Sequence, residues 1–276
     1  MYPLIASAIK DGAPASDEIV FDFTHLSFVE SAGVVILSNL VEWLRKRGVT
    51  VSYANCTRAK PAVAYLDDVG FFAAYWGNSL SPEARIRSTT YPFRRLQCID
   101  SHQWLDGNVF PWIADKLSVK FSALNEFKTS VRELFNNISD HSAEQVGCMH
   151  VQWYPNIERM KIAISDFGVG IPAEVRKVRE EVTDYQALCI ATQEGFSSRP
   201  GRNMGAGLNY IVDNIVKRYK GWVGIYSGGG FITFNHVYAV GSGGVARGLY
   251  PGTLVSMILP VANLVPEEDE ASESPW

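Results

Sequence analysis

The sequence predicts an α/β protein made of two domains. Residues 19–66 alternate strand and helix patterns twice, which is typical of a βαβ arrangement with a right-handed crossover. Farther along, a long amphipathic helix pattern over 122–141 is followed by strands whose apolar residues alternate, as in an antiparallel hairpin. We expect a first domain over 1–80, a linker over 81–92, a second domain over 93–264 and a disordered acidic tail over 265–276.

The first domain is expected to begin with a strand over Ile19–Phe23 and to continue with a helix that Arg45–Gly48 closes. Cations in the last turn and a glycine just beyond it are the usual end of a helix. A second strand follows over Val49–Tyr53, and a second helix over Pro61–Leu66. The apolar residues of the first helix recur at helical spacing: Val34, Leu37, Leu40, Val41 and Leu44.

The second domain has strand and helix patterns in a different order. Helices are expected over Trp104–Leu117, Ser122–His141 and Glu174–Gln193, with a loop over 194–203. Strands are expected over Tyr91–Ile99, Met149–Trp153, Met160–Ile164, Trp222–Tyr226, Gly230–Val240 and Leu254–Pro260.

Composition limits the classes of function. The chain has 276 residues, 47% hydrophobic and 20% charged, as in ordinary globular proteins, and its net charge of −4 gives no electrostatic reason to expect nucleic acid as the main partner. It lacks a long apolar run and a signal-peptide pattern, so we expect a cytoplasmic protein that does not enter membranes. The scattered cysteines predict reduced, buried thiols rather than disulfides or zinc ligands: Cys56, Cys98, Cys148 and Cys189.

The stretch Ser165–Pro172 is the strongest candidate for a ligand site. Asp166 stands where an apolar strand ends, and Gly168 and Gly170 follow it. Glycines without a Cβ allow a sharp turn and the close approach of a flat or charged ligand. Alone, this pattern fits a plain turn as well as a ligand site.

Two other stretches favour the ligand site. Glu133 and Asn137 are one turn apart on the helix over 122–141, away from its apolar stripe. They are either a solvated polar face or a carboxylate and an amide that position a water and a hard cation. The glycine-rich segment Gly201–Tyr210 runs into an apolar helix pattern, and free N–H groups at a helix start suit phosphate.

In this order, the stretches resemble the motifs of the GHKL ATPases, the family of gyrase, the heat-shock chaperone ATPase, histidine kinases and mismatch-repair ATPases. The matching segments are Glu133–Asn137, Asp166–Pro172, Gly205–Leu208 and Gly252–Thr253. The resemblance implies a Bergerat α/β sandwich, with a mixed, mostly antiparallel sheet covered by helices, that binds ATP and Mg²⁺. No P-loop pattern and no dinucleotide-binding glycine fingerprint is present.

The resemblance also implies a role for each residue on the adenine side. Asp166 would accept a hydrogen bond from the adenine amino group and so select ATP over GTP. Gly168 and Gly170 would make room for the base, Ile171 would pack on it, and Thr253 would complete the contact through its hydroxyl.

On the phosphate side, Asn137 would ligate Mg²⁺ through its amide oxygen. Gly205, Gly207 and the N–H of Leu208 would hold the phosphates, and Glu133 would orient and deprotonate the attacking water. Arg199 and Arg202 are either lid residues that reach the γ-phosphate or ordinary loop charges, and Asp140 is either a second acidic site position or a solvated carboxylate.

Residues 15–77 resemble a STAS domain, the fold of anti-sigma-factor antagonists. The turn that opens their helix reads Glu30-Ser-Ala-Gly33, which departs from the commonest form of that family at two positions. Ser31 stands where such antagonists carry their phosphorylated serine, and serine is also a good helix cap, so both roles stay open.

Three functions remain open at this point. The first is a Mg²⁺-dependent GHKL ATPase, slow or dependent on a partner, that acts as a nucleotide-controlled switch toward a protein partner or in a homodimer. The second is a partner-switching serine kinase acting on a STAS serine such as Ser31. The third is a non-catalytic adaptor that binds another protein. Glutamate at position 133 favours hydrolysis.

Overall fold

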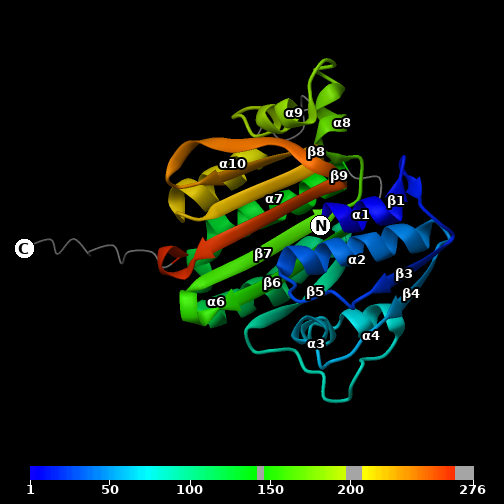
Figure 1. The fold of residues 1–276 in the computed structure, drawn as a ribbon. Coiled ribbons are helices and arrows are strands. Elements are labelled where there is room, and N and C mark those ends of the chain that lie inside the picture. The colour runs from blue at the N-terminus through cyan, green and yellow to red at the C-terminus, as the bar shows by residue number, and fades with distance from the viewer. Residues whose placement is uncertain (142–145, 197–206, 265–276) are drawn as a thin grey trace, which may run out of the picture.

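A five-stranded sheet is the centre of the protein (Figure 1). The computed structural model describes residues 1–141, 146–196 and 207–264. Neighbouring strands of this sheet pair antiparallel. Their order is β5 (Thr90–Gln97), β6 (Val146–Tyr154), β7 (Arg159–Asp166), β9 (Tyr238–Pro260) and β8 (Trp222–Asn235). The mixed α/β class and the mostly antiparallel sheet are confirmed.

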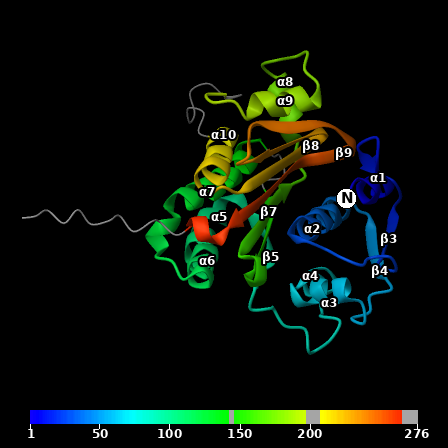
Figure 2. The same cartoon turned by 60° about the vertical axis from the view of Figure 1, so that its left-hand side comes forward.

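One face of this sheet, here called the helix face, is covered by helices that lie on one side of it in Figure 2. These are α5 (Cys98–Trp104), the π-helix η1 (Leu105–Val109), α6 (Phe110–Leu117), the 3₁₀ turn η2 (Phe121–Leu124), α7 (Asn125–His141), α10 (Leu208–Val212) and the π-helix η4 (Asp213–Arg218). The apolar stripe expected on α7 is buried in full and meets the sheet: Phe127, Val131, Leu134, Phe135 and Ile138.

Three element boundaries differ from those expected. The helix expected over 104–117 begins at Cys98, and a π-turn over Leu105–Val109 leads into α6. The helix expected over 174–193 is two helices, α8 (Gly170–Arg176) and α9 (Asp184–Ala191), because Thr183 and Gln186 form a capping box that starts a new helix. The strands expected over 230–240 and 254–260 belong to one long hairpin of β8 and β9.

The N-terminal part contains the expected strand–helix–strand–helix order. Strands β3 (Glu18–Asp22) and β4 (Thr50–Ala54) pair in parallel, and the helix α2 (Ser31–Lys46) connects them. The helices α3 (Pro61–Asp68) and α4 (Phe71–Trp76) follow. The sequence did not predict α1 (Tyr2–Ala8) or the small hairpin of β1 (Ile9–Lys10) and β2 (Ala13–Pro14).

Helix α2 covers the other face of the five-stranded sheet, here called the α2 face. It lies between that sheet and the pair β3–β4 (Figure 2), and its residues share one core with Cys148, Ala163 and Leu254 of the sheet. A helix enclosed on all sides has to be apolar around its whole circumference. The buried residues of α2 meet this condition with three polar exceptions: Ser31, Val34, Val35, Ile36, Leu37, Ser38, Asn39, Leu40, Val41, Trp43 and Leu44. The expected division of the chain into a domain over 1–80 and a domain over 93–264 stays a prediction.

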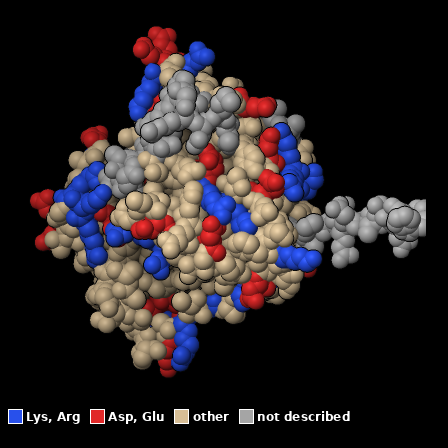
Figure 3. Space-filling view, turned by 180° about the vertical axis from the view of Figure 1, so that it is seen from behind, with Lys and Arg blue, Asp and Glu red and all other residues tan. Residues whose placement is uncertain are grey.

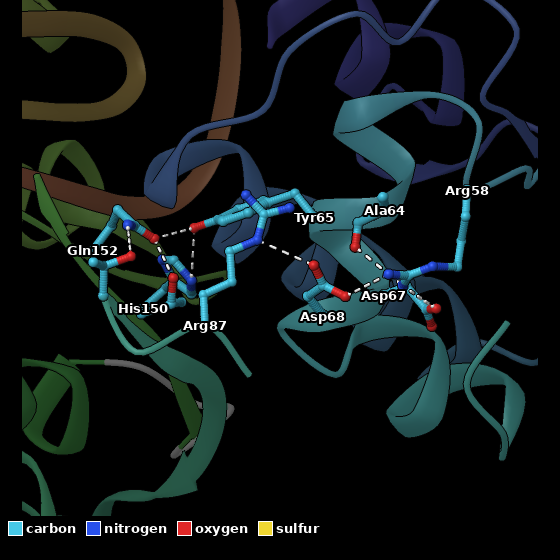
Figure 4. Close-up of polar contacts among 10 residues, drawn as sticks. Arg58, Ala64, Tyr65, Asp67, Asp68, Arg87, His150 and Gln152 are labelled. Atoms are coloured by element: carbon cyan, nitrogen blue, oxygen red, sulfur yellow. Dashed lines mark hydrogen bonds and ion pairs between the residues drawn. The ribbon is translucent and has the colours of Figure 1, made fainter. Parts of the chain in front are cut away.

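Polar groups pair across the α2 face. The Asn39 amide donates to Ser165 Oγ at 2.8 Å, and the same Oγ contacts the hydroxyl of Tyr250. Farther along the sheet, the Tyr65 hydroxyl of α3 lies 2.8 Å from Gln152 Oε1 and 3.3 Å from His150 Nε2 (Figure 4). His150 is fully buried, and burial lowers its pKa to about 3. The imidazole is therefore neutral at physiological pH.

The segment expected as a linker, 81–92, makes defined contacts. Arg87 pairs with Asp68 at 3.1 Å, and Arg58 holds Asp67 and Asp68 at 2.6 and 2.8 Å (Figure 4). The last residues of the segment belong to the sheet, since β5 begins at Thr90. The tail expected over 265–276 lies outside the described residues.

Two expectations from composition can be compared with the structure. All four cysteines are free, but only Cys98 and Cys148 are buried, while Cys56 and Cys189 are half-buried. None of the helices described is both long and apolar enough for a bilayer crossing. On the side of the molecule seen in Figure 3, basic and acidic side chains are interspersed.

Candidate functional site

Asp166 ends β7 on the helix face of the sheet. Its neighbours at alternate positions, Ile162 and Ile164, point into the core under the helices, while Ala163 belongs to the α2 face. The carboxyl is buried, and its Oδ1 accepts the Gly168 N–H at 2.7 Å. Burial raises the pKa of Asp166 to about 6, although backbone hydrogen bonds from Gly168 and Thr253 lower it in part.

The turn after Asp166 and the strand beside it each require a glycine. Gly170 has φ +79°, and Gly252 on the adjacent strand has φ +82°. A Cβ on Gly252 would lie 2.3 Å from the Asp166 carbonyl oxygen and 2.7 Å from the Gly168 nitrogen. The two backbones are therefore in direct contact, and this pairs the Asp166–Gly170 turn with the Gly252–Thr253 segment.

Thr253 and Ile171 lie beside this turn. Thr253 is the register partner of Asp166 in the pairing of β7 with β9, so the two side chains are on the same face. The Ile171 side chain is half-buried against the core under the helices, and its N–H donates to Ser227 Oγ at 2.9 Å. Asp166, Gly168, Gly170, Ile171 and Thr253, predicted as the adenine side of the site, thus form one cluster.

Glu133 and Asn137 lie on the half-buried side of α7. Glu133 Oε2 accepts the Asn136 amide at 3.2 Å. The Asn137 Nδ2 atom is buried and has no hydrogen-bond partner among the described residues. A buried amide without a partner costs free energy, which a ligand that offers an acceptor would recover.

Helix α10 brings Gly207 to Asn137. Arg218 of η4 lies 3.7 Å from Glu126, and Asn214 donates to Ser130 at 3.3 Å, so α10 and η4 run antiparallel to α7. At the other end of this contact, a Cβ on Gly207 would lie 4.0 Å from Asn137 Oδ1.

Leu208 is the first residue of α10 and packs its half-buried side chain against the core under the helices. Gly207 and Leu208, predicted as part of the phosphate side, thus lie beside Asn137.

The group around Asp166 and the group formed by Asn137, Gly207 and Leu208 lie at the same end of the sheet. Ile138 follows Asn137 on α7 and packs on Gly147, since a Cβ there would meet the Ile138 side chain at 2.8 Å. Gly147 precedes Cys148, whose register partner is Ser165, the neighbour of Asp166. The second half of α7 therefore lies over the strand ends that carry Asp166.

Several predicted positions lie outside this description. Gly205, Arg199 and Arg202 fall in 197–206, outside the described residues, and the side chain of Asp140 is likewise not described. Among the described residues, no group of three or more histidine, cysteine, aspartate or glutamate side chains is placed to hold a metal ion.

Ser31, the alternative phosphoacceptor, begins α2 on the opposite face of the sheet. It is 2% exposed, and its hydroxyl finds no hydrogen-bond partner in the part of the chain that the structure describes. Next to it, Glu30 pairs with Lys161 of β7 at 2.8 Å. Phosphorylation of Ser31 would therefore require α2 to leave the sheet.

The sequence reading missed Ser227 and Asp184. Ser227 is fully buried. Its hydroxyl accepts the Ile171 N–H and donates to the Gly252 carbonyl oxygen, and so joins the two segments predicted to contact adenine. Asp184, at the start of α9, accepts the Gly229 N–H at 2.5 Å and so fixes α9 against β8. The three successive glycines at 228–230 are the sequence feature that could have indicated a close contact here. A Cβ on Gly228 would lie 2.6 Å from Asp184 Oδ2.

Comparison with known proteins adds little to this geometry. No family model matches the chain. No curated protein matches it either. Among solved structures, the B subunit of the DNA gyrase from Myxococcus xanthus matches with 17% identity and a TM-score of 0.23, over 40% of this chain and 30% of that chain. The match thus spans less than a third of that subunit, and a TM-score this low carries no argument about function.

Proposed function

We infer that the protein binds ATP with Mg²⁺ and hydrolyses it, slowly or in response to a partner, as a nucleotide-controlled switch. The observation that carries this proposal is the buried carboxyl of Asp166 in a turn built from close-packed glycines. A carboxylate removed from water needs hydrogen-bond donors, and an adenine amino group is a donor of suitable size. Among the described residues, no lysine or arginine pairs with Asp166.

The phosphate side is supported by Asn137 and Gly207. Bound Mg²⁺ would neutralise phosphate charge, and Asn137 offers an amide oxygen of the kind that hard cations accept. Since no cluster of acidic or imidazole ligands is present among the described residues, the nucleotide itself would supply most ligands of the ion. The unpartnered Asn137 Nδ2 fits a site in which a phosphate oxygen accepts its hydrogen bond.

Hydrolysis would depend on Glu133. It lies one helical turn before Asn137 on α7, and the described structure pairs it only with Asn136. A carboxylate in that position would orient a water and accept its proton while the phosphate group is transferred. A positioned base of this kind contributes about 10²–10⁴-fold to the rate.

Calorimetry with Mg²⁺·ATP tests the binding half of this proposal. Asp166→Asn should abolish measurable binding, because an amide presents an N–H group or a weaker acceptor to the base. Asp115→Asn is the matched control, since the Asp115 side chain on α6 is 75% exposed and pairs with Lys116. Equal affinity in wild type and Asp166→Asn would refute the adenine contact.

Release of labelled phosphate from γ-labelled ATP tests the hydrolysis half. Glu133→Gln should lower the release about 100-fold or more while ATP still binds. Glu158→Gln, at an exposed loop position, should leave it unchanged. Label that stays on the protein and disappears in Ser31→Ala would instead establish the serine kinase. If the wild type does not bind ATP, the non-catalytic adaptor is the function that remains of the three.

A further inference from the structure

The hydrogen bonds of Ser227 use its one proton and one of its two lone pairs. Ser227 ends the regular part of β8, is fully buried, and donates to the Gly252 carbonyl oxygen at 2.5 Å. The same Oγ accepts the Ile171 N–H at 2.9 Å. A serine hydroxyl has one proton and two lone pairs, so one lone pair remains.

That remaining lone pair faces Thr253. Thr253 Oγ1 lies 3.3 Å from Ser227 Oγ. Because the Ser227 proton already goes to Gly252, the hydrogen bond between the two hydroxyls can form only if Thr253 donates. Thr253 then has no proton left for a ligand and presents lone pairs alone.

We propose that Ser227 is a specificity-determining positioning residue, which fixes the Thr253 hydroxyl as an acceptor and so makes the site select a 6-amino purine over a 6-oxo purine. This inference rests on the proposed nucleotide site. Thr253 and Asp166 are register partners on one face of the sheet, so the base edge meets two acceptors. An exocyclic amino group donates to them, whereas a 6-oxo group places an acceptor against acceptors.

The inference assigns a different role to Ser227 than to Asp166. Asp166 is an acceptor because of its own charge, and Ser227 does not touch the base. Loss of the Ser227 hydroxyl frees the Thr253 hydroxyl to rotate and to donate to a 6-oxo group. The ratio of affinities for the two purines therefore changes, in addition to any general loss of affinity.

Binding of ATP and inosine triphosphate to the purified full-length protein tests this proposal, because hypoxanthine carries an oxo group where adenine carries the amino group. Ser227→Ala should lower the ATP-to-inosine-triphosphate affinity ratio about tenfold, the value of one neutral hydrogen bond. Thr233→Ala on the same strand, where the exposed hydroxyl donates to the Ser242 carbonyl oxygen, should leave the ratio unchanged. In the Thr253→Val background, Ser227→Ala should change the ratio no further.

The outcomes separate this proposal from the proposed function. A wild type that prefers ATP, with the same preference in Ser227→Ala, overturns the role of Ser227 and leaves the ATP site standing. An equal loss of both nucleotides in Ser227→Ala does the same, because a purely structural role weakens both alike. A change in the ratio that persists in the Thr253→Val background also overturns it. A wild type that binds neither nucleotide overturns the ATP site and this inference together.

Discussion

The two faces of the five-stranded sheet are buried in different ways. On the helix face, β7 contributes Met160, Ile162 and Ile164 to an apolar core, and polarity appears only at the end of the strand, with Asp166. On the α2 face, the partners are polar as well as apolar, as in the contact of Asn39 with Ser165. The helix face is stabilised by the apolar surface area that it buries. The α2 face adds hydrogen bonds, which are directional and fix how α2 lies on the sheet.

The difference matters for function because the faces meet at one strand end. Ser165 points toward α2 and Asp166 toward the proposed nucleotide site, although the two residues are adjacent. A displacement of β7 caused by contacts on the α2 face therefore also displaces Asp166 on the helix face. The predictions that follow separate the contributions of the two faces, from the largest expected effect to the smallest.

Leu40→Ala should give the largest loss of stability. Leu40 is fully buried in the middle of α2, so truncation leaves a cavity between two layers and should cost about 2–5 kcal/mol. Urea unfolding measures it, with Val20→Ala as control, because Val20 is 61% exposed and should change little. A loss below about 1 kcal/mol would indicate that α2 is not enclosed as described.

His150 should make the α2 face sensitive to acid. Burial lowers its pKa in the folded state to about 3 from the ordinary histidine value of 6.5. Between these pH values the unfolded chain binds a proton at this position and the folded chain does not. Stability is full above pH 6.5 and is lost as the pH falls toward 3, by about 3 kcal/mol at pH 4. His150→Phe, which keeps a ring beside Tyr65, should unfold with a flatter pH dependence in this window. Identical profiles would contradict the burial of a neutral imidazole.

Asp166 should have the opposite linkage on the helix face. Its pKa in the folded state is raised to about 6 from the ordinary value of 3.8, so the folded chain keeps this proton up to a higher pH than the unfolded chain does. The free energy of unfolding therefore falls as the pH rises from about 4 to 6. The charge costs about 3 kcal/mol above pH 6, estimated from the size of the shift. Asp166→Asn should therefore raise the melting temperature at pH 7 while it abolishes ATP binding. A destabilised Asp166→Asn protein would show that the carboxylate is needed for the fold instead.

Asn39→Ala should have the smallest effect on stability and measures the coupling between the faces. Loss of its buried hydrogen bond to Ser165 should cost about 1–2 kcal/mol. If β7 carries the shift to Asp166, ATP affinity should also fall several-fold. Asn108→Ala removes an exposed hydrogen bond to the Trp104 carbonyl oxygen and is the control for both measurements. Unchanged affinity in Asn39→Ala would mean that the two faces are independent.

The sequence could predict those parts of the fold and of the site that local patterns determine. The α7 stripe follows from helical periodicity, and the turn at Asp166 follows from a strand end with two glycines. His150 and Gln152, in contrast, alternate with apolar residues as if they faced water. Their burial depends on Tyr65, which is more than eighty residues away in the chain, and no local pattern records such a contact.

Other features were visible but ambiguous. Val35, Ile36 and Trp43 make α2 apolar beyond a single stripe, which indicates burial on several sides without naming what covers them. Ser31 looked like a helix cap or a phosphoacceptor, and only the packing of α2 on the sheet shows that its hydroxyl is enclosed. Ser227 belongs to no motif, because a single serine at a strand end carries no signal until its neighbours are known.

The position of α2 between two layers has a consequence during synthesis. The ribosome completes Lys46 long before it adds β7 and β9, the strands on which the helix packs. At about 5–20 residues per second, the delay is on the order of ten seconds. For that interval, the nascent chain exposes the apolar side of a helix whose docking surface does not yet exist. Chaperone binding to the nascent chain should therefore concentrate on α2 and end once β9 has been made.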